Sequence, residues 1–500
     1  MSRARAPVAV IDIGSNSGRV VVYAPEPGGA LRILASTRAS LRLVRELDET
    51  HALSRESVER AMDALRDFKA IAVGGAARRT LAVATAAVRD AANGRRFIER
   101  VRRELGIAVR ILSGEEEARY GFLGAVRGLP VQDGFLFDLG GGSLQLSRFR
   151  KRSLGEKASF PLGALRLSDA FLKSDPPTEK EMRRLRNHAR SFFEGSGMGR
   201  LARGEALVGT GGTVRNLAKV DQRLQRYPLH RLHAYALTRE RAERVVSLLA
   251  SRKLKKRVQV PGLNDDRGDS IVGGGLAIVA LMEWLGAGEI LVSGQGVREG
   301  LALGLADGAL PPGEAMRRSS AEALARAFRG SDPASGERRR GLAAALFDAL
   351  EPDGVAELRE ALLHAATLLD IGRSIDFFDR HEHLADIVVA TDLLGFTHRG
   401  IALLSAVARS AGDDGADLAR YAPLVSARDH AAIERAATLL VLADDIEERC
   451  PDDGPISLRV SLRPRRARVA VKGLGGWRPR RIGARFADAF GRDLAVVRAR

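Results

Sequence analysis

Two short stretches of the sequence, Asp12-Ile13-Gly14-Ser15-Asn16-Ser17 and Asp138-Leu139-Gly140-Gly141-Gly142-Ser143, follow one pattern. Each reads Asp, an aliphatic residue, Gly, two small residues and Ser. Strand-like runs flank both stretches: Val8 to Ile11 and Arg19 to Tyr23 around the first, Phe135 to Phe137 and Leu144 to Phe149 around the second. Two such runs joined by a short Gly-rich turn predict a β-hairpin. The repetition therefore predicts two related domains that face each other.

The turn of such a hairpin can bind an anion. Glycine accepts positive φ and has no Cβ, so several backbone N–H groups and hydroxyls can converge on one phosphate. The Asp at the strand end can hold the Mg²⁺ that accompanies phosphate, directly or through water. One such turn alone could equally be an ordinary tight hairpin, but two copies that each begin with Asp favour phosphate binding.

Two further glycine-rich segments follow strand-like runs. Gly209-Thr210-Gly211-Gly212-Thr213 opens a helical pattern, and the first N–H groups of a helix attract anions. Seen alone, this segment could be a plain strand-to-helix turn with a Thr cap. In the other segment, Ser293 to Gly300, Arg298 either faces a phosphate or pairs with Glu299 or Asp307.

The rest of the chain divides into an alternating part and a helical part. Helical patterns near 56–69 and 95–105 alternate with strand-like runs at 81–84 and 108–112, which is typical of α/β layers. The apolar run Ile271 to Met282 is too short to span a membrane and predicts a buried helix. After Pro311-Pro312-Gly313, residues 314–448 are expected to be helical, with apolar spacing in 342–350, 358–369, 384–394 and 433–442.

Composition excludes several classes of protein. A chain of 500 residues with 45% hydrophobic and 28% charged residues is neither disordered nor collagen-like. Cys450 is the only cysteine, so an internal disulfide and a multi-cysteine zinc site are both excluded. No signal peptide or membrane span is recognisable at the sequence level, and we expect a cytoplasmic protein without a membrane partner.

The formal net charge of +18 makes an anionic partner the first expectation. Residues 459–500 contain thirteen Lys and Arg against Asp488 and Asp493, a balance of +11. A solvated basic face without a ligand is one interpretation, and a track for a polyanion is the other. Nucleic acid is disfavoured because no nucleic-acid motif is present and few aromatic residues interrupt the basic segment. Period-two alternation after Pro451 predicts short strands in this tail.

Six ordered motifs resemble those of the exopolyphosphatase and guanosine pentaphosphatase family of the actin, Hsp70 and sugar kinase superfamily. They are DIGSNS at 12–17, ATAAVRDA at 84–91, ILSGEEEARYGFLGAV at 111–126, FDLGGGS at 137–143, GTGGT at 209–213 and SGQGVREGL at 293–301. The resemblance implies an α/β protein with two actin-like, ribonuclease H-like domains around a cleft, at 1–125 and 126–308. A mainly helical domain similar to HD phosphohydrolases, with the short basic β-containing tail, would occupy 309–500.

The resemblance also implies the site and its chemistry. Glu117 matches the family's general base, Asp138 the acidic residue that supports metal or water, and Asp12 the equivalent position in the first hairpin. Arg89 falls on the Arg of a Thr-x-x-x-Arg motif and is expected to contact the phosphate chain. Mg²⁺, or another divalent cation, is expected on Asp12, Asp138 and Gln145. The residues expected to bind phosphate are Ser15, Asn16, Ser17, Arg89, Gly140, Gly141, Gly142, Ser143, Gly209, Thr210, Gly211, Gly212 and Arg298.

The chain departs from the family pattern at two places. Gln145 stands where the family has Glu, and a neutral amide can ligate Mg²⁺ but adds no charge, so weakened metal binding or an altered rate is expected. The His-Asp doublet of HD enzymes is replaced by Leu369-Asp370, so no second metal site is expected despite His364, His381, His383 and Asp386 nearby. Dimer contact and guidance of the polyanion are the roles expected of this domain, in a homodimer.

Hydrolysis of inorganic polyphosphate, one terminal phosphate at a time, is the favoured activity, because a long basic surface suits a long polyanion. Hydrolysis of guanosine pentaphosphate to remove its 5′ γ-phosphate is the first alternative. A phosphotransferase on the same scaffold is disfavoured, because the Glu of the GEEEAR motif suits water and no sugar-binding segment is recognisable. A sensor with weakened catalysis is the third alternative, motivated by Gln145.

Overall fold

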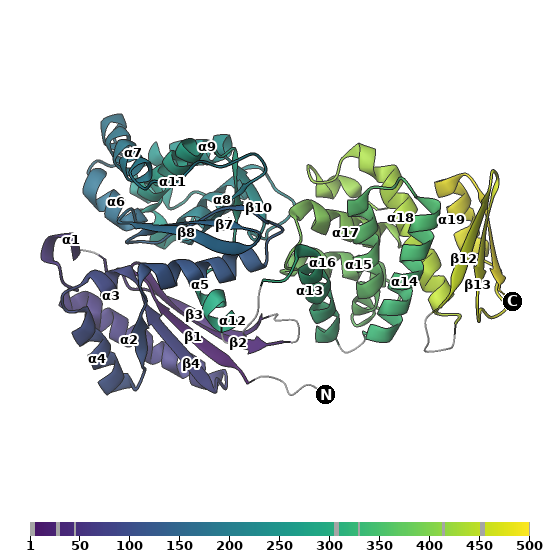
Figure 1. Ribbon diagram of the computed structural model, residues 1–500, viewed down its shortest axis with the longest axis horizontal. Helices are drawn as coiled ribbons and strands as arrows, with labels where there is room; N and C mark the ends of the chain where they lie inside the picture. The colour runs from purple at the N-terminus through teal and green to yellow at the C-terminus, as the bar shows by residue number, and fades with distance from the viewer. Residues whose placement is uncertain are drawn as a thin grey trace. The chain divides into compact units, whose positions relative to one another are not determined.

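The computed structural model describes residues 6–499 except 27–30, 45–46, 305–309, 329–330, 413–415 and 451–455. The chain separates into two compact units. Unit 1 contains Met1–Arg226 and Leu232–Gly313, and unit 2 contains Tyr227–Arg231 and Glu314–Arg500. Figure 1 shows the α/β layers of unit 1 and the helices of unit 2.

The first lobe of unit 1 is built on a five-stranded sheet in the order β3-β2-β1-β4-β5. The strands β1, β2 and β3 pair antiparallel, whereas β1, β4 and β5 pair parallel. Helices pack against this sheet, and their apolar residues form one core with it. The elements are β1 (Val8–Ile13), β2 (Ser17–Pro25), β3 (Leu31–Ser40), α1 (Leu47–Thr50), α2 (Arg55–Gly74), β4 (Arg79–Ala84), α3 (Ala86–Asp90), α4 (Gly94–Leu105) and β5 (Val109–Ile111).

The second lobe repeats this arrangement in a sheet of order β10-β11-β9-β6-β7-β8. Here β6, β7 and β8 pair antiparallel and β6, β9 and β11 pair parallel, so both lobes share the same strand order around a central hairpin. The predicted hairpins and the predicted pair of related α/β domains are therefore confirmed. The strands are β6 (Gly134–Leu139), β7 (Leu144–Arg150), β8 (Ser153–Phe160), β9 (Ala206–Thr210), β10 (Tyr235–Thr238) and β11 (Glu289–Val292).

The helices of the second lobe include the predicted apolar one. In α11 (Ile271–Leu285) every residue except Glu283 is buried, as expected of a helix that is apolar on all sides. A residue in the left-handed conformation, Gly286, ends it. The other helical segments are α6 (Ala164–Phe171), α7 (Glu179–Glu194), α8 (Gly212–Leu224), α9 (Arg239–Ala250), α10 (Leu254–Arg257) and η2 (Asp265–Arg267). Two helices cross between the lobes: α5 (Gly114–Arg127) packs on the sheet of the second lobe, and α12 (Val297–Leu303) packs on β1 of the first.

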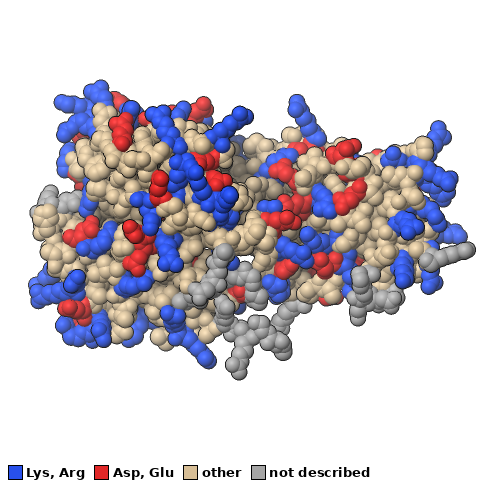
Figure 2. All heavy atoms as spheres, viewed as in Figure 1, with Lys and Arg blue, Asp and Glu red and all other residues tan. Residues whose placement is uncertain are grey.

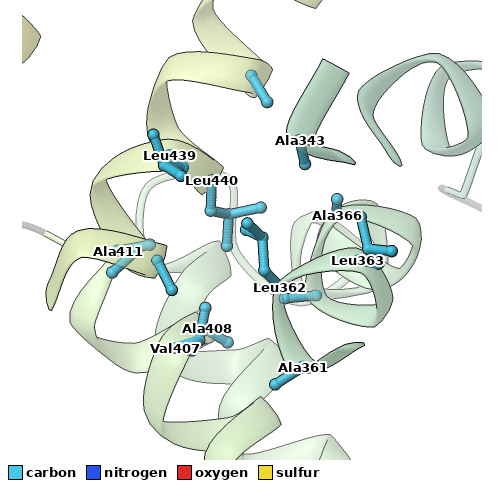
Figure 3. Packing of buried hydrophobic residues seen from close by; sticks show 14 of the residues in the cluster. Ala343, Ala361, Leu362, Leu363, Ala366, Val407, Ala408, Ala411, Leu439 and Leu440 are labelled. Carbon is cyan, nitrogen blue, oxygen red and sulfur yellow. The ribbon is translucent and has the colours of Figure 1, made fainter. Parts of the chain in front are cut away.

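Unit 2 is a bundle of helices around an apolar core. Figure 3 shows Leu362 of α15 and Leu440 of α18 meeting between helices, with alanines such as Ala408 and Ala343 at the close contacts. The short alanine side chains let the helix axes approach, while the leucines fill the space between them. The helical elements are α13 (Gly313–Ala327), α14 (Pro333–Leu350), α15 (Ala356–Arg373), α16 (Arg380–Ala390), α17 (His398–Ser410), η3 (Leu418–Tyr421), η4 (Ala427–Asp429) and α18 (His430–Glu447).

The helix expected through residue 394 ends earlier, because α16 stops at Ala390 and Thr391 is extended. Leu393 is nevertheless buried in the core, and the N–H of Leu394 donates to Ser320 Oγ at 2.9 Å. These leucines supplied the helix-like spacing, but they pack from a loop.

The basic tail forms a small sheet in the order β12-β13-β14. β12 and β13 pair antiparallel, and α19 connects β13 to the parallel strand β14. Ala467, Val469 and Val471 are buried and alternate with exposed Arg466 and Arg468, which gives the predicted period of two. The elements are β12 (Leu458–Arg463), β13 (Arg466–Val471), α19 (Arg480–Phe490) and β14 (Asp493–Arg498).

No helix within these described ranges has the length and apolar character that a membrane crossing needs.

Candidate active site

A pocket of about 130 Å³ in unit 1 lies where the two predicted hairpin turns meet. The turns supply its floor, and segments from both lobes supply its walls. Its lining residues are Asp12, Gly14, Ser15, Asn16, Ser17, Thr85, Glu117, Asp138, Leu139, Gly140, Gly141, Gly142, Ser143, Thr210, Gly211, Gly212, Arg215, Arg267, Gly296, Val297 and Arg298. Fourteen of the residues expected from the sequence are therefore brought together, and three, Arg89, Gly209 and Gln145, do not line the pocket.

The two turns touch each other. Each is closed by a backbone hydrogen bond, from Gly14 N to Ser17 O at 3.2 Å and from Gly140 N to Ser143 O at 3.0 Å. A Cβ added at Gly142 would lie 2.9 Å from Ser15 Oγ, so a side chain there would force the turns apart. The glycines thus permit two rows of N–H groups and hydroxyls to face one small volume.

The third glycine-rich segment closes one wall. Gly211 has a φ of +104°, and a Cβ there would lie 3.0 Å from Asp138 Oδ1. Only glycine fits this position, from which α8 begins beside Asp138. Thr210 donates to the carbonyl of Gln295 at 2.8 Å and so ties this segment to the fourth glycine-rich one. Gly209 instead packs in the sheet, where an added Cβ would lie 2.6 Å from the ring of Phe137.

Glu117 enters the pocket from the first turn of α5. Ser113 caps this helix, and the side chain of Glu116 accepts a hydrogen bond from Ser113 N, which completes a capping box. Glu115 is exposed. Glu117 is the least exposed of the three glutamates, with 11% of its side chain accessible. Arg89 Nη1 donates to its Oε2 at 3.2 Å and to Leu112 O at 3.0 Å. The structure thus places Arg89 beside the carboxylate, behind the pocket lining.

Burial raises the pKa of all three carboxylates of the pocket. Burial, followed by the negative charge of Asp138, raises the pKa of Glu117 to about 8, and Arg89 opposes this rise. Burial raises the pKa of Asp138 to about 6, against the positive charge of Arg215 and with the help of Asp12. Burial also raises the pKa of Asp12, although Arg298 lowers it. A cation placed among these groups would relieve their repulsion.

Arg298 pairs with Asp12, a partner that the sequence did not suggest. Its Nη1 lies 3.2 Å from Asp12 Oδ2. Glu299 instead accepts from Tyr23 Oη at 2.6 Å and from Gly296 N at 2.7 Å. Asp307 lies outside the described residues. Arg298 therefore reaches the pocket from the start of α12, while Glu299 anchors this segment on β2 of the first lobe.

Gln145 lies opposite Asp138 in the β6–β7 pairing. Its side chain is buried, and Nε2 donates to Ser143 Oγ at 2.7 Å. Gln145 thus contacts the hydroxyl of Ser143, which lines the pocket, but does not line the pocket itself. Its expected role as a metal ligand stays a prediction.

Two arginines of the pocket were missed from the sequence. Arg215 lies in the first turn of α8, and burial lowers its pKa to about 10, with further lowering by Arg298. Its position three residues after the Gly211-Gly212 turn could have indicated an arginine in the first turn of the helix that this turn opens, close to the predicted anion site. Arg267 comes from η2, and nothing local in the sequence marks it as a pocket residue.

The donors of the pocket fit a hard cation such as Mg²⁺. Asp12 and Asp138 supply carboxylate oxygens, the ligands that Mg²⁺ prefers. The parts of the chain that the structure describes contain no cluster of three His, Cys, Asp or Glu able to hold a metal by themselves. Since Mg²⁺ is commonly held by one or two carboxylates together with substrate phosphates, this set suits an ion that arrives with its substrate.

The HD-like positions of unit 2 are engaged in other contacts. Asp370 binds the guanidinium of Arg339, and Asp386 pairs with Arg409. His364 lies 3.7 Å from Glu360 and against the ring of Phe396. The described part of unit 2 contains no group of three His, Cys, Asp or Glu that could hold a metal ion. The dimer contact expected of this unit stays a prediction.

Two α/β lobes of similar strand order around a pocket of glycine turns, carboxylates and arginines are typical of a protein that handles phosphoryl groups. A model described as the Ppx/GppA phosphatase family matches residues 21–308, and a model of domain III of that family matches residues 316–453. The chain belongs to the Ppx/GppA phosphatase family and is a phosphatase.

Named relatives agree with this assignment. Exopolyphosphatase 1 of Mycobacterium leprae (strain TN) is 30% identical over 300 residues, which cover 59% of this chain and 88% of that protein. Exopolyphosphatase 1 of Mycobacterium tuberculosis (strain ATCC 25618 / H37Rv) is 29% identical over 340 residues, which cover 67% and 98%. The crystal structure of the Aquifex aeolicus family member is 29% identical, with a TM-score of 0.52 over 60% of this chain and 97% of that one.

Proposed function

We propose that the chain is an exopolyphosphatase that removes terminal phosphate from inorganic polyphosphate and releases orthophosphate. The observation that carries the proposal is the placement of Glu117, a buried carboxylate, at a pocket lined by both phosphate turns. The pocket has a volume of about 130 Å³, whereas typical ligand sites have volumes of about 300–1,000 Å³, so it suits the terminal part of a polyphosphate chain.

In the proposed reaction, Glu117 takes a proton from a water molecule as the water oxygen attacks the terminal phosphorus. The bond from that phosphorus to the bridging oxygen breaks, and the shortened chain leaves with the bridging oxygen. The turn N–H groups, Arg298 and Arg215 stabilise the charge on the phosphoryl oxygens. Mg²⁺ bound through Asp12 and Asp138 would neutralise further phosphate charge.

The basic tail favours a long polyanion over a single nucleotide. Arg459 and Arg463 of β12 and Arg466 and Arg468 of β13 are exposed. In β13 they alternate with residues of the core. Figure 2 shows Lys and Arg side chains gathered over this part of unit 2. A row of like charges raises the local concentration of a polyanion without recognising its sequence or bases. Residues 454–500 lie beyond the residues that the two family models match.

Long-chain polyphosphate is expected to be hydrolysed with a higher kcat/KM than guanosine pentaphosphate. The reason is the basic surface, which one nucleotide cannot span. Orthophosphate release should be measured with Mg²⁺ at equal concentrations of terminal phosphates. An equal or higher value for the nucleotide would reverse the assignment.

Ionic strength provides the control for this comparison. Attraction of a long chain to exposed arginines weakens as salt shortens the Debye length, whereas contacts inside the pocket are screened less. The kcat/KM for long-chain polyphosphate should therefore fall more steeply with salt than that for tripolyphosphate. Parallel slopes would show that the tail does not contribute.

The pH dependence of kcat/KM is expected to report Glu117. The ionised carboxylate is the active base, and its fraction grows with pH, so kcat/KM should rise about ten-fold per unit below pH 8 and level off above it. Arg89→Met removes the guanidinium that lowers the pKa of Glu117 and should move this rise to higher pH. The pH profile of each variant, measured at saturating Mg²⁺, provides the check.

The control is Arg103→Met, which changes an exposed arginine of α4 and should leave the pH profile of kcat/KM unchanged. If Arg89 contacts the phosphate chain instead, Arg89→Met would raise KM and leave the pH profile in place.

A further inference from the structure

The segment Asp265–Ser270 carries Arg267 from the second lobe into the pocket. The side chain of Arg267 is only 11% exposed. A Cβ added at Gly212 would lie 2.8 Å from its Cζ, so the guanidinium lies against the backbone where α8 begins. Asp266 Oδ2 lies 3.8 Å from Arg267 Nε, too far for a close hydrogen bond, which leaves the guanidinium able to bind a phosphoryl oxygen.

The residues on either side of Arg267 pair with arginines of the other lobe. Asp266 pairs with Arg38 on β3, and Asp269 Oδ2 lies 2.8 Å from Arg42 Nη1. All four side chains are about one quarter exposed. Two ion pairs thus fasten one short segment of the second lobe to the first lobe, on both sides of the residue that enters the pocket.

Arg42 also holds the phosphate turn of the first lobe. Its N–H and that of Leu41 both donate to the carbonyl of Asn16, each at 2.9 Å. Arg42 has a φ of +51°, a conformation that costs energy for a residue with a Cβ. The strained residue therefore connects Asn16, in one wall of the pocket, to the segment that supplies Arg267 in another.

We propose that Arg38 and Arg42 are positioning residues that hold Arg267 against the substrate's phosphate chain. They touch no substrate themselves. Their two ion pairs form only when the lobes are close, so they couple closure of the pocket to delivery of Arg267. The inference deepens the proposed function, because it assigns a shared task to residues of both lobes at the same site.

The test is binding of inorganic tripolyphosphate with Mg²⁺, measured by calorimetry in the full-length chain carrying Glu117→Gln. Arg38→Met with Arg42→Met should weaken binding about ten-fold, as expected when a hydrogen bond to a charged group is lost. Met keeps a Cβ at both positions and so leaves the backbone strain at Arg42 unchanged. In a chain that also carries Arg267→Ala, the two substitutions should have no further effect. Equal losses with and without Arg267 would overturn the proposal.

Two further variants keep the test independent of folding. Arg32→Met, on the same strand β3 but paired with Glu26 inside the first lobe, should bind as before. Exchange of the partners, Arg42→Asp with Asp269→Arg, should restore most of the affinity lost in Arg42→Met, and failure to restore it would count against positioning by this pair. Because binding is read without turnover, a lack of phosphate release by the unsubstituted chain would refute the proposed function and leave this result standing.

Discussion

Glu117→Gln is expected to lower kcat for orthophosphate release from polyphosphate about 10²- to 10⁴-fold, the range typical for loss of a general base. The amide has the size of the carboxylate but cannot accept the proton of the attacking water. Glu117 is the least exposed of the three adjacent glutamates 115–117. Its pKa, raised to about 8, makes its carboxylate a stronger base than an exposed glutamate would be. Binding should persist, because the turns and arginines that hold phosphate are untouched.

The measurement is steady-state phosphate release together with calorimetric binding of tripolyphosphate. Glu115→Gln is the matched control, since Glu115 lies in the same helical turn with its side chain 82% exposed, and it should retain wild-type kcat. The rise of rate with pH assigned to Glu117 should also disappear in the Gln variant. A variant with near-normal kcat would show that another group activates the water.

The repeated hairpins could be predicted because their signals are local. Asp12 and Asp138 each end a buried strand, and a few following residues determine the turn. The related strand orders of the two lobes followed from that repetition. The buried helix α11 was predictable for the same reason, because its apolar run is continuous in sequence.

Residues brought in by tertiary folding could not be placed in this way. Arg267 reaches the pocket only because η2 lies against the start of α8, more than fifty positions earlier in the chain. Tyr227–Arg231 belongs to unit 2, since Leu229 is buried in the helical core and Tyr227 Oη lies 3.0 Å from His398 Nδ1. No pattern within such short segments indicates which distant surface they will meet.

Residue type alone also did not reveal which way a side chain faces. Gly209 and Gly211 are two positions apart, yet one packs on Phe137 inside the sheet and the other lines the pocket. Arg89 and Arg298 were both expected on phosphate, and the structure gives each a carboxylate partner, Glu117 and Asp12. These pairings depend on strand register and helix phase, which motif spacing does not report.

Unit 2 contains a fully buried arginine that contacts Asp370, the acidic residue that remains of the HD-like doublet. Arg339 is 0% exposed, and its Nε lies 2.6 Å from Asp444 Oδ1 while Nη2 lies 3.2 Å from Asp370 Oδ1. Ala366 O and Ser335 Oγ accept further hydrogen bonds from its Nη1 and Nη2. One guanidinium thereby joins α14, α15 and α18, with its charge matched by carboxylates that are themselves buried.

Arg339→Met is expected to lower the free energy of unfolding of unit 2 by about 3–5 kcal/mol, the cost of leaving buried charges without their partner. Met fills a similar volume, so the loss reports the charge and its hydrogen bonds more than a cavity. Arg339→Lys keeps the charge with fewer donors and should lose less. The readout is urea unfolding followed by fluorescence of Trp477, which packs on Arg449 in unit 2, in a background carrying Trp284→Phe that removes the chain's other tryptophan.

The matched control is Arg318→Met, in the same unit, where a half-exposed arginine pairs with Glu322 and Glu337. Exposed ion pairs contribute about 0–1 kcal/mol, so the Trp477 transition should barely move. The difference between the two variants separates a buried network from surface pairs of similar composition. Arg339→Met could instead lower the free energy of unfolding no more than Arg318→Met does. In that case Arg373 and Arg380, which contact the same carboxylates, would suffice to neutralise them, and the buried guanidinium would not be what joins the three helices.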